Sequence, residues 1–285
     1  MVYRICPIVI ALFLLVTMSC ALAEDSKATQ GDAVQAQAIL TVSEGKRLIA
    51  KAVAQMPAVK KALQDGMIIV GRGTTDTYVA EELTGRKIGH GSYVVGWTGP
   101  AKGGKTFPAS ERTTDIVLVK GTVQPDLSMD DALKNLKAGD VVIKGANALD
   151  VDHKLAGVLI GGGPTSSAGT TGKILPVIVA RKAHLIIPIG LEKQVTGSIV
   201  DIANKMREPV ESLNDIPSMF LLNGEIITEI EALEVLTGLQ VFQAAAGGGA
   251  GAEGASRLVL RGPRDQVQQA LTLVESIQGE PPFVE

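Results

Sequence analysis

Short apolar runs alternate with helix-like segments through the first two thirds of the chain. Five runs are typical of buried strands, and they cover residues 67–70, 115–120, 140–144, 157–160 and 184–189. Segments predicted to be helices lie before and between them, over residues 43–56, 57–65, 74–83, 128–136 and 174–182. Alternation of this kind predicts an α/β fold with a mostly parallel, Rossmann-like sheet and helices on both faces, over residues 43–217.

The pattern changes near residue 218. The elements predicted from there on are a strand over 219–222, a helix over 226–236, strands over 239–246 and 257–260, and a helix from Pro263. The order β-α-β-β-α predicts a small α+β module, ferredoxin-like or ACT-like, over residues 218–285. Its Gly/Ala-rich segment 247–254 is interpreted as a hairpin connection.

The first residues have the composition of a targeting segment. Arg4 precedes an apolar run over residues 8–16, and an Ala-x-Ala site ends at Ala23. Because a membrane-spanning helix needs roughly 20 apolar residues, we expect residues 1–23 to be a cleavable signal peptide for export to the periplasm or the exterior. A lipoprotein anchored at Cys20 is the less favoured alternative, since Thr17 matches a lipidation motif poorly. No membrane association is expected after cleavage.

Composition narrows the chemistry of the remaining chain. Both cysteines, Cys6 and Cys20, lie in the signal segment, which excludes disulfides and thiolate sites from the mature protein. Without Arg4, 26 basic residues oppose 30 acidic ones, and no basic block predicts nucleic-acid binding. The three histidines share no metal-ligand spacing, so neither a metal nor a cofactor is expected. The polar, Ala/Gln-rich residues 24–42 are predicted to be a flexible leader.

The first predicted buried strand leads into a loop rich in glycine and threonine. Glycines let the backbone turn sharply, and hydroxyls where a helix begins add to its free N–H groups and positive dipole end. The ligand-binding residues predicted here are Gly71, Arg72, Gly73, Thr74, Thr75 and Thr77. An ordinary strand-to-helix turn whose threonines cap the helix explains the loop equally well, so the loop alone leaves both interpretations open.

Two further polar loops follow predicted strands. Residues 145–150 follow one strand, and the glycine- and hydroxyl-rich residues 161–173 follow the next. Since ligands in α/β sheets bind beyond the carboxyl ends of the strands, we expect the three loops to form one cleft. The ligand-binding residues predicted in these two loops are Asn147, Gly161, Gly162, Gly163, Thr165 and Ser166.

Three segments resemble the superfamily of ribose-5-phosphate isomerase A, glucosamine-6-phosphate deaminase and the CoA transferases (the NagB/RpiA/CoA transferase-like superfamily). Residues 66–75, GMIIVGRGTT, are similar to the loop with which this family grips phosphate or an anionic substrate. Residues 145–150, GANALD, resemble a Gly-Ala-Asp-x-x-Asp turn of the isomerase, and residues 159–163, LIGGG, resemble its Lys-Gly-Gly-Gly segment. The resemblance spans roughly residues 43–200 and implies a site for a phosphosugar or related anion.

The chain departs from the isomerase at its acid and base positions. Asn147 replaces the first acid of the turn, and Ile160 or Gly161 stands where the family has lysine. Acid/base isomerisation needs a titratable group in reach of the substrate, and the resemblance leaves Asp150, with Lys173 as an anion partner. Glu192 is the one candidate for the glutamate of the CoA transferases, although an ordinary surface charge explains it too.

These residues favour an exported protein that holds a small anionic metabolite, bearing phosphate or carboxylate, in its Gly/Thr-rich loops. One alternative is a phosphosugar isomerase or lyase that uses Asp150 and Lys173 as catalytic residues. A second alternative is a structural protein, a possible homo-oligomer assembled through residues 218–285. The sequence leaves open whether any reaction is catalysed.

Overall fold

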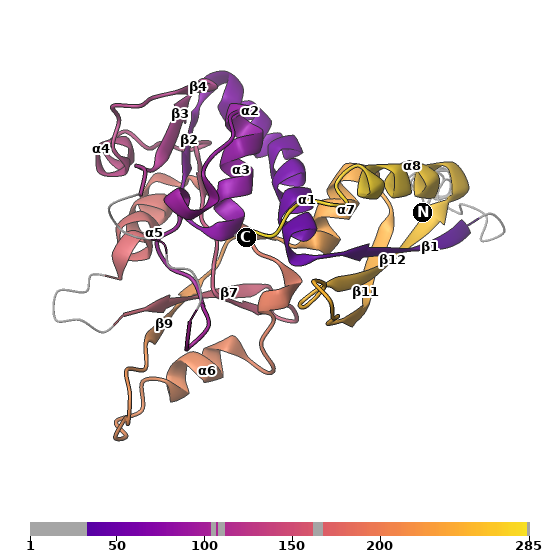
Figure 1. The fold of residues 1–285 in the computed structure, drawn as a ribbon. Coiled ribbons are helices and arrows are strands. Elements are labelled where there is room, and N and C mark those ends of the chain that lie inside the picture. Colours follow the sequence, from indigo (N-terminus) through magenta and orange to yellow (C-terminus); the bar gives the residue numbers. More distant parts are fainter. Residues whose placement is uncertain (1–32, 104–106, 108–111, 162–167, 284–285) are drawn as a thin grey trace, which may run out of the picture.

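The computed structural model describes residues 33–103, 107, 112–161 and 168–283 (Figure 1). The predicted signal peptide lies outside these residues. The strands are β1 (Ala33–Leu40), β2 (Met67–Val70), β3 (Ile116–Val119), β4 (Thr122–Val123), β5 (Val141–Ile143), β6 (Ala148–Asp150), β7 (Leu155–Ile160), β8 (His184–Pro188), β9 (Ser218–Leu222), β10 (Glu225–Ile227), β11 (Gln240–Ala246) and β12 (Ser256–Pro263). The helices are α1 (Val42–Gln55), α2 (Pro57–Asp65), α3 (Thr74–Thr84), α4 (Met129–Lys134), α5 (Gly169–Arg181), α6 (Ile199–Lys205), α7 (Glu229–Thr237) and α8 (Arg264–Glu275), with short 3₁₀ turns η1 (His90–Tyr93) and η3 (Leu191–Lys193).

A six-stranded mixed sheet forms the centre of the molecule, in the order β10-β8-β5-β2-β3-β4. Neighbours from β10 to β2 run parallel, whereas β3 and β4 are antiparallel to the strands beside them. The prediction of an α/β fold is confirmed, and its central sheet is mixed. All five predicted buried strands are present, and each contributes to this sheet except β7, which belongs to another.

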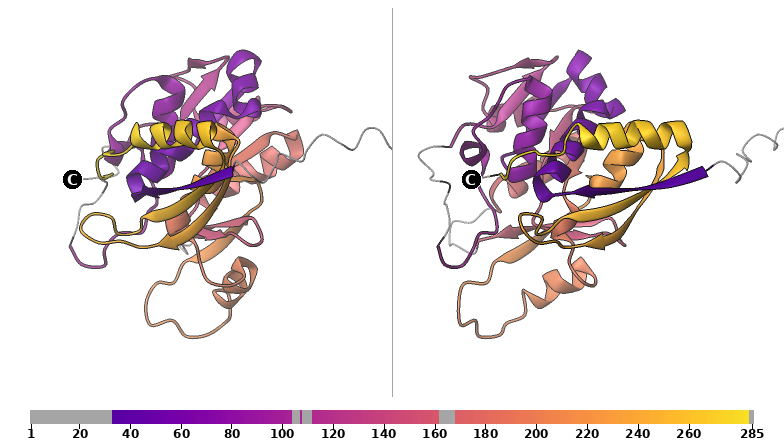
Figure 2. Two further views of the ribbon diagram at one scale, coloured as in Figure 1. Left: turned by 90° about the vertical axis from the view of Figure 1, so that its right-hand side faces the viewer. Right: turned by 45° about the vertical axis from the view of Figure 1, so that its right-hand side comes forward.

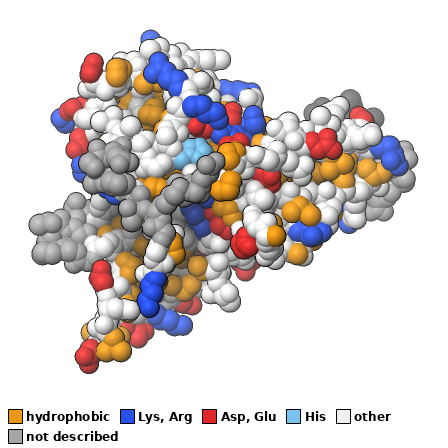
Figure 3. All heavy atoms as spheres, viewed as in Figure 1, with side chains coloured by type: hydrophobic (Ala, Val, Ile, Leu, Met, Phe, Trp, Pro, Cys, Tyr) orange, Lys and Arg blue, Asp and Glu red, His pale blue; other side chains and the backbone are white. Residues whose placement is uncertain are grey.

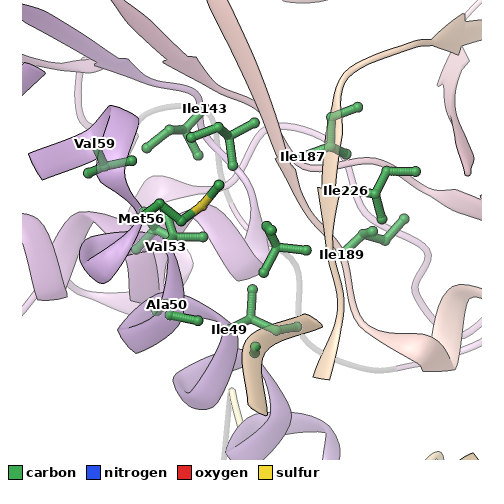
Figure 4. Packing of buried hydrophobic residues seen from close by; sticks show 14 of the residues in the cluster. Ile49, Ala50, Val53, Met56, Val59, Ile143, Ile187, Ile189 and Ile226 are labelled. Carbon is green, nitrogen blue, oxygen red and sulfur yellow. The ribbon is translucent and has the colours of Figure 1, made fainter. Parts of the chain in front are cut away.

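Helix α1 packs its apolar side against the central sheet. Ile49 and Val53 are fully buried, and Figure 4 shows Val53 and Met56 on the side of α1 that faces Ile143 of β5. Burial of such side chains stabilises the fold by roughly 1.5–3 kcal/mol each. The helix begins at a capping box, in which the Thr41 hydroxyl accepts from the Glu44 N–H and the Glu44 carboxylate accepts from the Thr41 N–H.

A second sheet, β6-β7-β9, forms a lobe below the central sheet together with α6 (Figure 1). All of its pairs are antiparallel. Apolar side chains gather on the visible surface of this lobe (Figure 3). Leu159 of β7 and Phe220 of β9 are more than one third exposed. Strand β7 carries the chain from this lobe to the third predicted loop.

A third sheet, β1-β12-β11, lies to one side of the central sheet, with α7 and α8 packed against it (Figure 2). Its first strand corrects the prediction of a flexible leader over residues 24–42, because residues 33–40 pair with β12 along their whole length. Gln35 and Gln37 are exposed, whereas Ala38 and Leu40 are buried. This alternation is that of a strand with one buried face. Residues 24–32 lie outside the described part of the chain.

Residues 218–285 do not form a separate module as predicted. Strand β9 pairs with β7 in the lower lobe, β10 pairs with β8 in the central sheet, and only the later elements join β1. The predicted helix over residues 226–236 is also corrected, since residues 225–227 form β10 and α7 begins at Glu229. A short run such as Ile226-Ile227 fits either element, and pairing with β8 decides between them.

Candidate functional site

A cavity of about 1040 Å³ lies where the loops after β2, β5 and β7 meet. Strands β2 and β5 are parallel neighbours, so their carboxyl ends open at the same edge of the sheet. Residues from all three predicted polar loops line the cavity, namely 72–76, 145–147, 161 and 168–171. The structure therefore brings together the loops that the sequence singled out.

Within the first loop, Arg72, Gly73, Thr74 and Thr75 line the cavity. Arg72 is already paired, because its Nε lies 3.0 Å from Asp115 Oδ1. The hydroxyl of Thr75 is buried and has no hydrogen-bond partner within the described residues. Thr75 is 2% exposed. Its hydroxyl is therefore a buried polar group in the cavity wall whose hydrogen-bonding capacity is left unsatisfied by the part of the chain that the structure describes.

The two outer positions of the predicted loop set have structural roles. Gly71 is buried, and its N–H donates to the Ile143 carbonyl, which extends the β2–β5 pairing. The Thr77 hydroxyl donates to the Gly73 carbonyl, at 2.8 Å, in the first turn of α3. Neither residue lines the cavity, so the structure does not place them in a binding role.

The other loops contribute fewer of their predicted residues. Asn147 lines the cavity, but its Oδ1 accepts from the Leu159 N–H at 3.0 Å and so holds β7 in place. Gly161 lines the cavity. The predicted ligand-binding residues Gly162, Gly163, Thr165 and Ser166 lie outside the described residues.

The structure does not place Asp150 in the cavity, in contrast to its predicted catalytic role. Its carboxylate accepts from the N–H groups of His153 and Ile199, each at 3.0 Å, and from the His153 ring. These bonds, of which the one from Ile199 has the largest effect, lower the pKa of Asp150. Asp150 fixes the turn after β6 and the start of α6, which the short sequence motif could not reveal.

Lys173, the predicted anion partner, is also outside the cavity. It lies on α5, where its Nζ is 2.9 Å from both carboxylate oxygens of Asp130, in the first turn of α4. Its side chain is 51% exposed, so this is a solvated surface ion pair of little energetic weight.

Two lysines that the sequence did not single out occupy the cavity wall instead. Lys144 follows β5 and donates from Nζ to the Gly145 carbonyl at 2.8 Å; Lys193 ends η3 and donates to the Ala146 carbonyl at 2.8 Å. Within the described residues, neither ammonium group lies within 4.0 Å of a carboxylate. The only sequence signal for Lys144 was its place at the carboxyl end of a buried strand.

Asp76 belongs to the same cavity wall and is fully buried. Both of its carboxylate oxygens accept from the Gly145 N–H, at 2.9 and 3.1 Å, which ties the first loop to the second. Burial raises the pKa of Asp76 to about 6, against the opposing effect of Lys144. Burial likewise lowers the pKa of Lys144. A Cβ at residue 73 would lie 2.6 Å from Asp76 Oδ2, which explains the glycine there.

A second group of charged side chains, Lys46 and Glu192, also lines the cavity. Lys46 Nζ is 3.8 Å from Glu192 Oε1, and Glu192 Oε2 is buried without a hydrogen-bond partner in the described residues. Burial lowers the pKa of Lys46. Behind them, Glu229 Oε2 accepts from the Leu191 N–H at 2.9 Å. Glu192 is therefore a cavity residue and not an ordinary surface charge.

Four basic side chains and two acidic ones line the cavity in the part of the chain that the structure describes. Within those residues, no group of three or more His, Cys, Asp or Glu side chains could hold a metal ion. The described helices also include none that is long and apolar enough to cross a bilayer. Comparison of the chain with protein-family models, with curated proteins and with solved structures finds no match.

Proposed function

We propose that the protein binds a small anionic ligand in the cavity between the three loops. The observation that carries this proposal is the pair Lys144 and Lys193, two partly buried cations in a cavity wall without a carboxylate within 4.0 Å. Placing unpaired charge in a poorly solvated site costs free energy. A phosphate or carboxylate between the two ammonium groups offsets that cost and forms charge-assisted hydrogen bonds.

Helix α3 supplies further donors to the same place. The helix begins in the cavity wall, and its N-cap residue, Gly73, has no side chain that could cap it. The first N–H groups of the helix have no hydrogen-bond partner inside the helix. The dipole of an 11-residue helix favours negative charge at this end. The unpartnered hydroxyl of Thr75 adds one more donor, so backbone, hydroxyl and ammonium groups converge.

Isothermal titration of the full chain tests the proposal. The titrants are inorganic phosphate, phosphosugars, nucleotides and small carboxylates, with an uncharged sugar as control. We expect saturable binding of at least one anion class and none of the uncharged sugar. Absence of binding for every anion would overturn the proposal.

The finer assignments made from sequence belong to this proposal as well. The order of the three motifs and their meeting at one cavity support an isomerase-like scaffold of the NagB/RpiA type with a Rossmann-like core. Export through residues 1–23 and self-association also stay predictions, whereas the ferredoxin-like module over residues 218–285 is not carried forward, because its strands divide among three sheets. Catalysis through Asp150 and Lys173 is not carried forward, because both residues are engaged elsewhere.

A further inference from the structure

A group of aromatic side chains lines the same cavity as Lys144 and Lys193. The protein has one Trp, three Tyr and five Phe, and four of these nine rings form one cluster with His90. The Trp97 and Phe107 centroids are 4.5 Å apart, and Phe107 meets Phe283 edge-on at 6.1 Å. Trp97, Phe107 and Phe283 all line the cavity. In a chain with 3% aromatic residues, this is a marked concentration of rings.

Exposed apolar side chains accompany these rings. Val95 and Leu159 line the cavity and are 39% and 37% exposed. Apolar surface left open in a concave site gains free energy when an apolar ligand covers it. The cavity volume of about 1040 Å³ exceeds what an isolated phosphate or carboxylate could fill.

The charged and aromatic parts of the cavity are continuous. Lys46 Nζ lies 5.9 Å from the centre of the Phe283 ring and 3.8 Å from Glu192 Oε1, and Glu192 adjoins Lys193 in the chain. One ligand can therefore span from the ammonium groups to the rings. The cavity offers charge complementarity at one end and stacking surface at the other.

We infer that the ligand joins an anionic head to a planar ring, the head lying between Lys144 and Lys193 and the ring against Trp97. This inference rests on the proposed function and adds the chemical class of the ligand. The competing explanation is that the rings only anchor the end of the chain, where Phe283 stacks on His90 with centroids 4.7 Å apart. Trp97 separates the two explanations, because its ring contact is with Phe107 and not with Phe283.

Titration calorimetry with three phosphates tests the inference on the full chain: inorganic phosphate, phenyl phosphate and cyclohexyl phosphate. Stacking of the planar ring on an aromatic side chain strengthens binding, so phenyl phosphate should bind about tenfold more tightly than inorganic phosphate. It should also bind more tightly than cyclohexyl phosphate, which has similar size without a planar ring. Trp97 is the single tryptophan, and its fluorescence should change with phenyl phosphate.

Two variants at one position sharpen the test. Trp97→Leu should bring the affinity for phenyl phosphate close to that for inorganic phosphate, and Trp97→Phe should keep most of the difference. Equal binding of all three phosphates by the native protein would overturn the inference and leave the proposed function standing. Absence of binding for every phosphate and every other anion would instead overturn the proposed function.

Discussion

Lys144 and Lys193 donate hydrogen bonds to two consecutive carbonyl groups of one turn, those of Gly145 and Ala146. The distance from Nζ to the carbonyl oxygen is 2.8 Å in both bonds. The two lysines are 49 residues apart in the chain and follow different strands of the central sheet, β5 and β8. Because each ammonium group has three donors and uses one on the turn within the described residues, both retain capacity for a shared anion.

Lys144→Met and Lys193→Met should each weaken anion binding by about tenfold or more, since hydrogen bonds to charged groups are worth about 1.5–3 kcal/mol. Affinity is measured by titration calorimetry with the anion that the native protein binds most tightly among the titrants named above. Lys173→Met is the matched control, because Lys173 pairs with Asp130 outside the cavity. Equal losses in all three variants would contradict a specific role for the cavity lysines.

Asp150→Asn should lower the free energy of unfolding by about 1–3 kcal/mol, because an amide cannot accept every bond that the buried carboxylate accepts. Urea unfolding followed by circular dichroism measures this change. Asp152→Asn, at an exposed neighbouring position, is the control. We expect anion affinity to stay unchanged in Asp150→Asn; lost affinity with unchanged stability would restore Asp150 to the site.

Glu229→Gln should change how stability depends on pH. Burial first, and then the Glu192 carboxylate, raise the pKa of Glu229 to about 7 from an ordinary value of 4.5, while Lys46 opposes the shift. The folded state therefore holds this proton more tightly than the unfolded chain. The contribution of Glu229 to the stability of the native protein should be greatest below about pH 4.5. It should fall as the pH rises towards 7.

The glutamine variant carries no such charge and can still accept from the Leu191 N–H. Its stability relative to the native protein should increase by up to about 3 kcal/mol between pH 4 and pH 8. Thermal unfolding over this range, with the exposed Glu234→Gln as control, checks the expectation. A relative stability that stays constant with pH would show that Glu229 does not titrate differently in the folded state.

Arg47→Met should destabilise the fold strongly. The buried guanidinium lies 2.6 Å from Glu81 and 3.0 Å from Glu280, and it also pairs with Glu82 at 3.1 Å. Removal of the arginine takes away the closest basic partner of all three carboxylates, at a cost of about 3–5 kcal/mol. Chemical denaturation measures the loss of stability. Arg257→Met, at an exposed position of β12, is the control and should change the free energy of unfolding little.

The sequence predicted the parts of the fold that depend on local pattern. Strand β2 matches its prediction over residues 67–70, because four consecutive buried apolar residues admit few other structures. The meeting of the loops followed from the general geometry of parallel strands. Strand β1 was missed, since its alternation is carried by alanine and glutamine, which have weak strand propensity.

The chemistry of the site depended on side-chain direction, which a single sequence does not contain. Asp150 matched a short motif, yet its carboxylate points to backbone N–H groups beside α6. Nothing in the sequence singled out Lys144 and Lys193, because only the folded chain brings both to one turn. Residue types were a good guide to which loops meet and a poor guide to which side chains face the cavity.

The pairing of β1 with β12 has a consequence for synthesis of the protein. Ala33 lies opposite Pro263, so the sheet joins segments that are 230 residues apart in the chain. Contacts of such long sequence separation form slowly, since a long loop must close before they contribute. The first strand must therefore wait with an unpaired edge until residues 256–263 have left the ribosome, and a chaperone that binds extended segments would protect it in that interval.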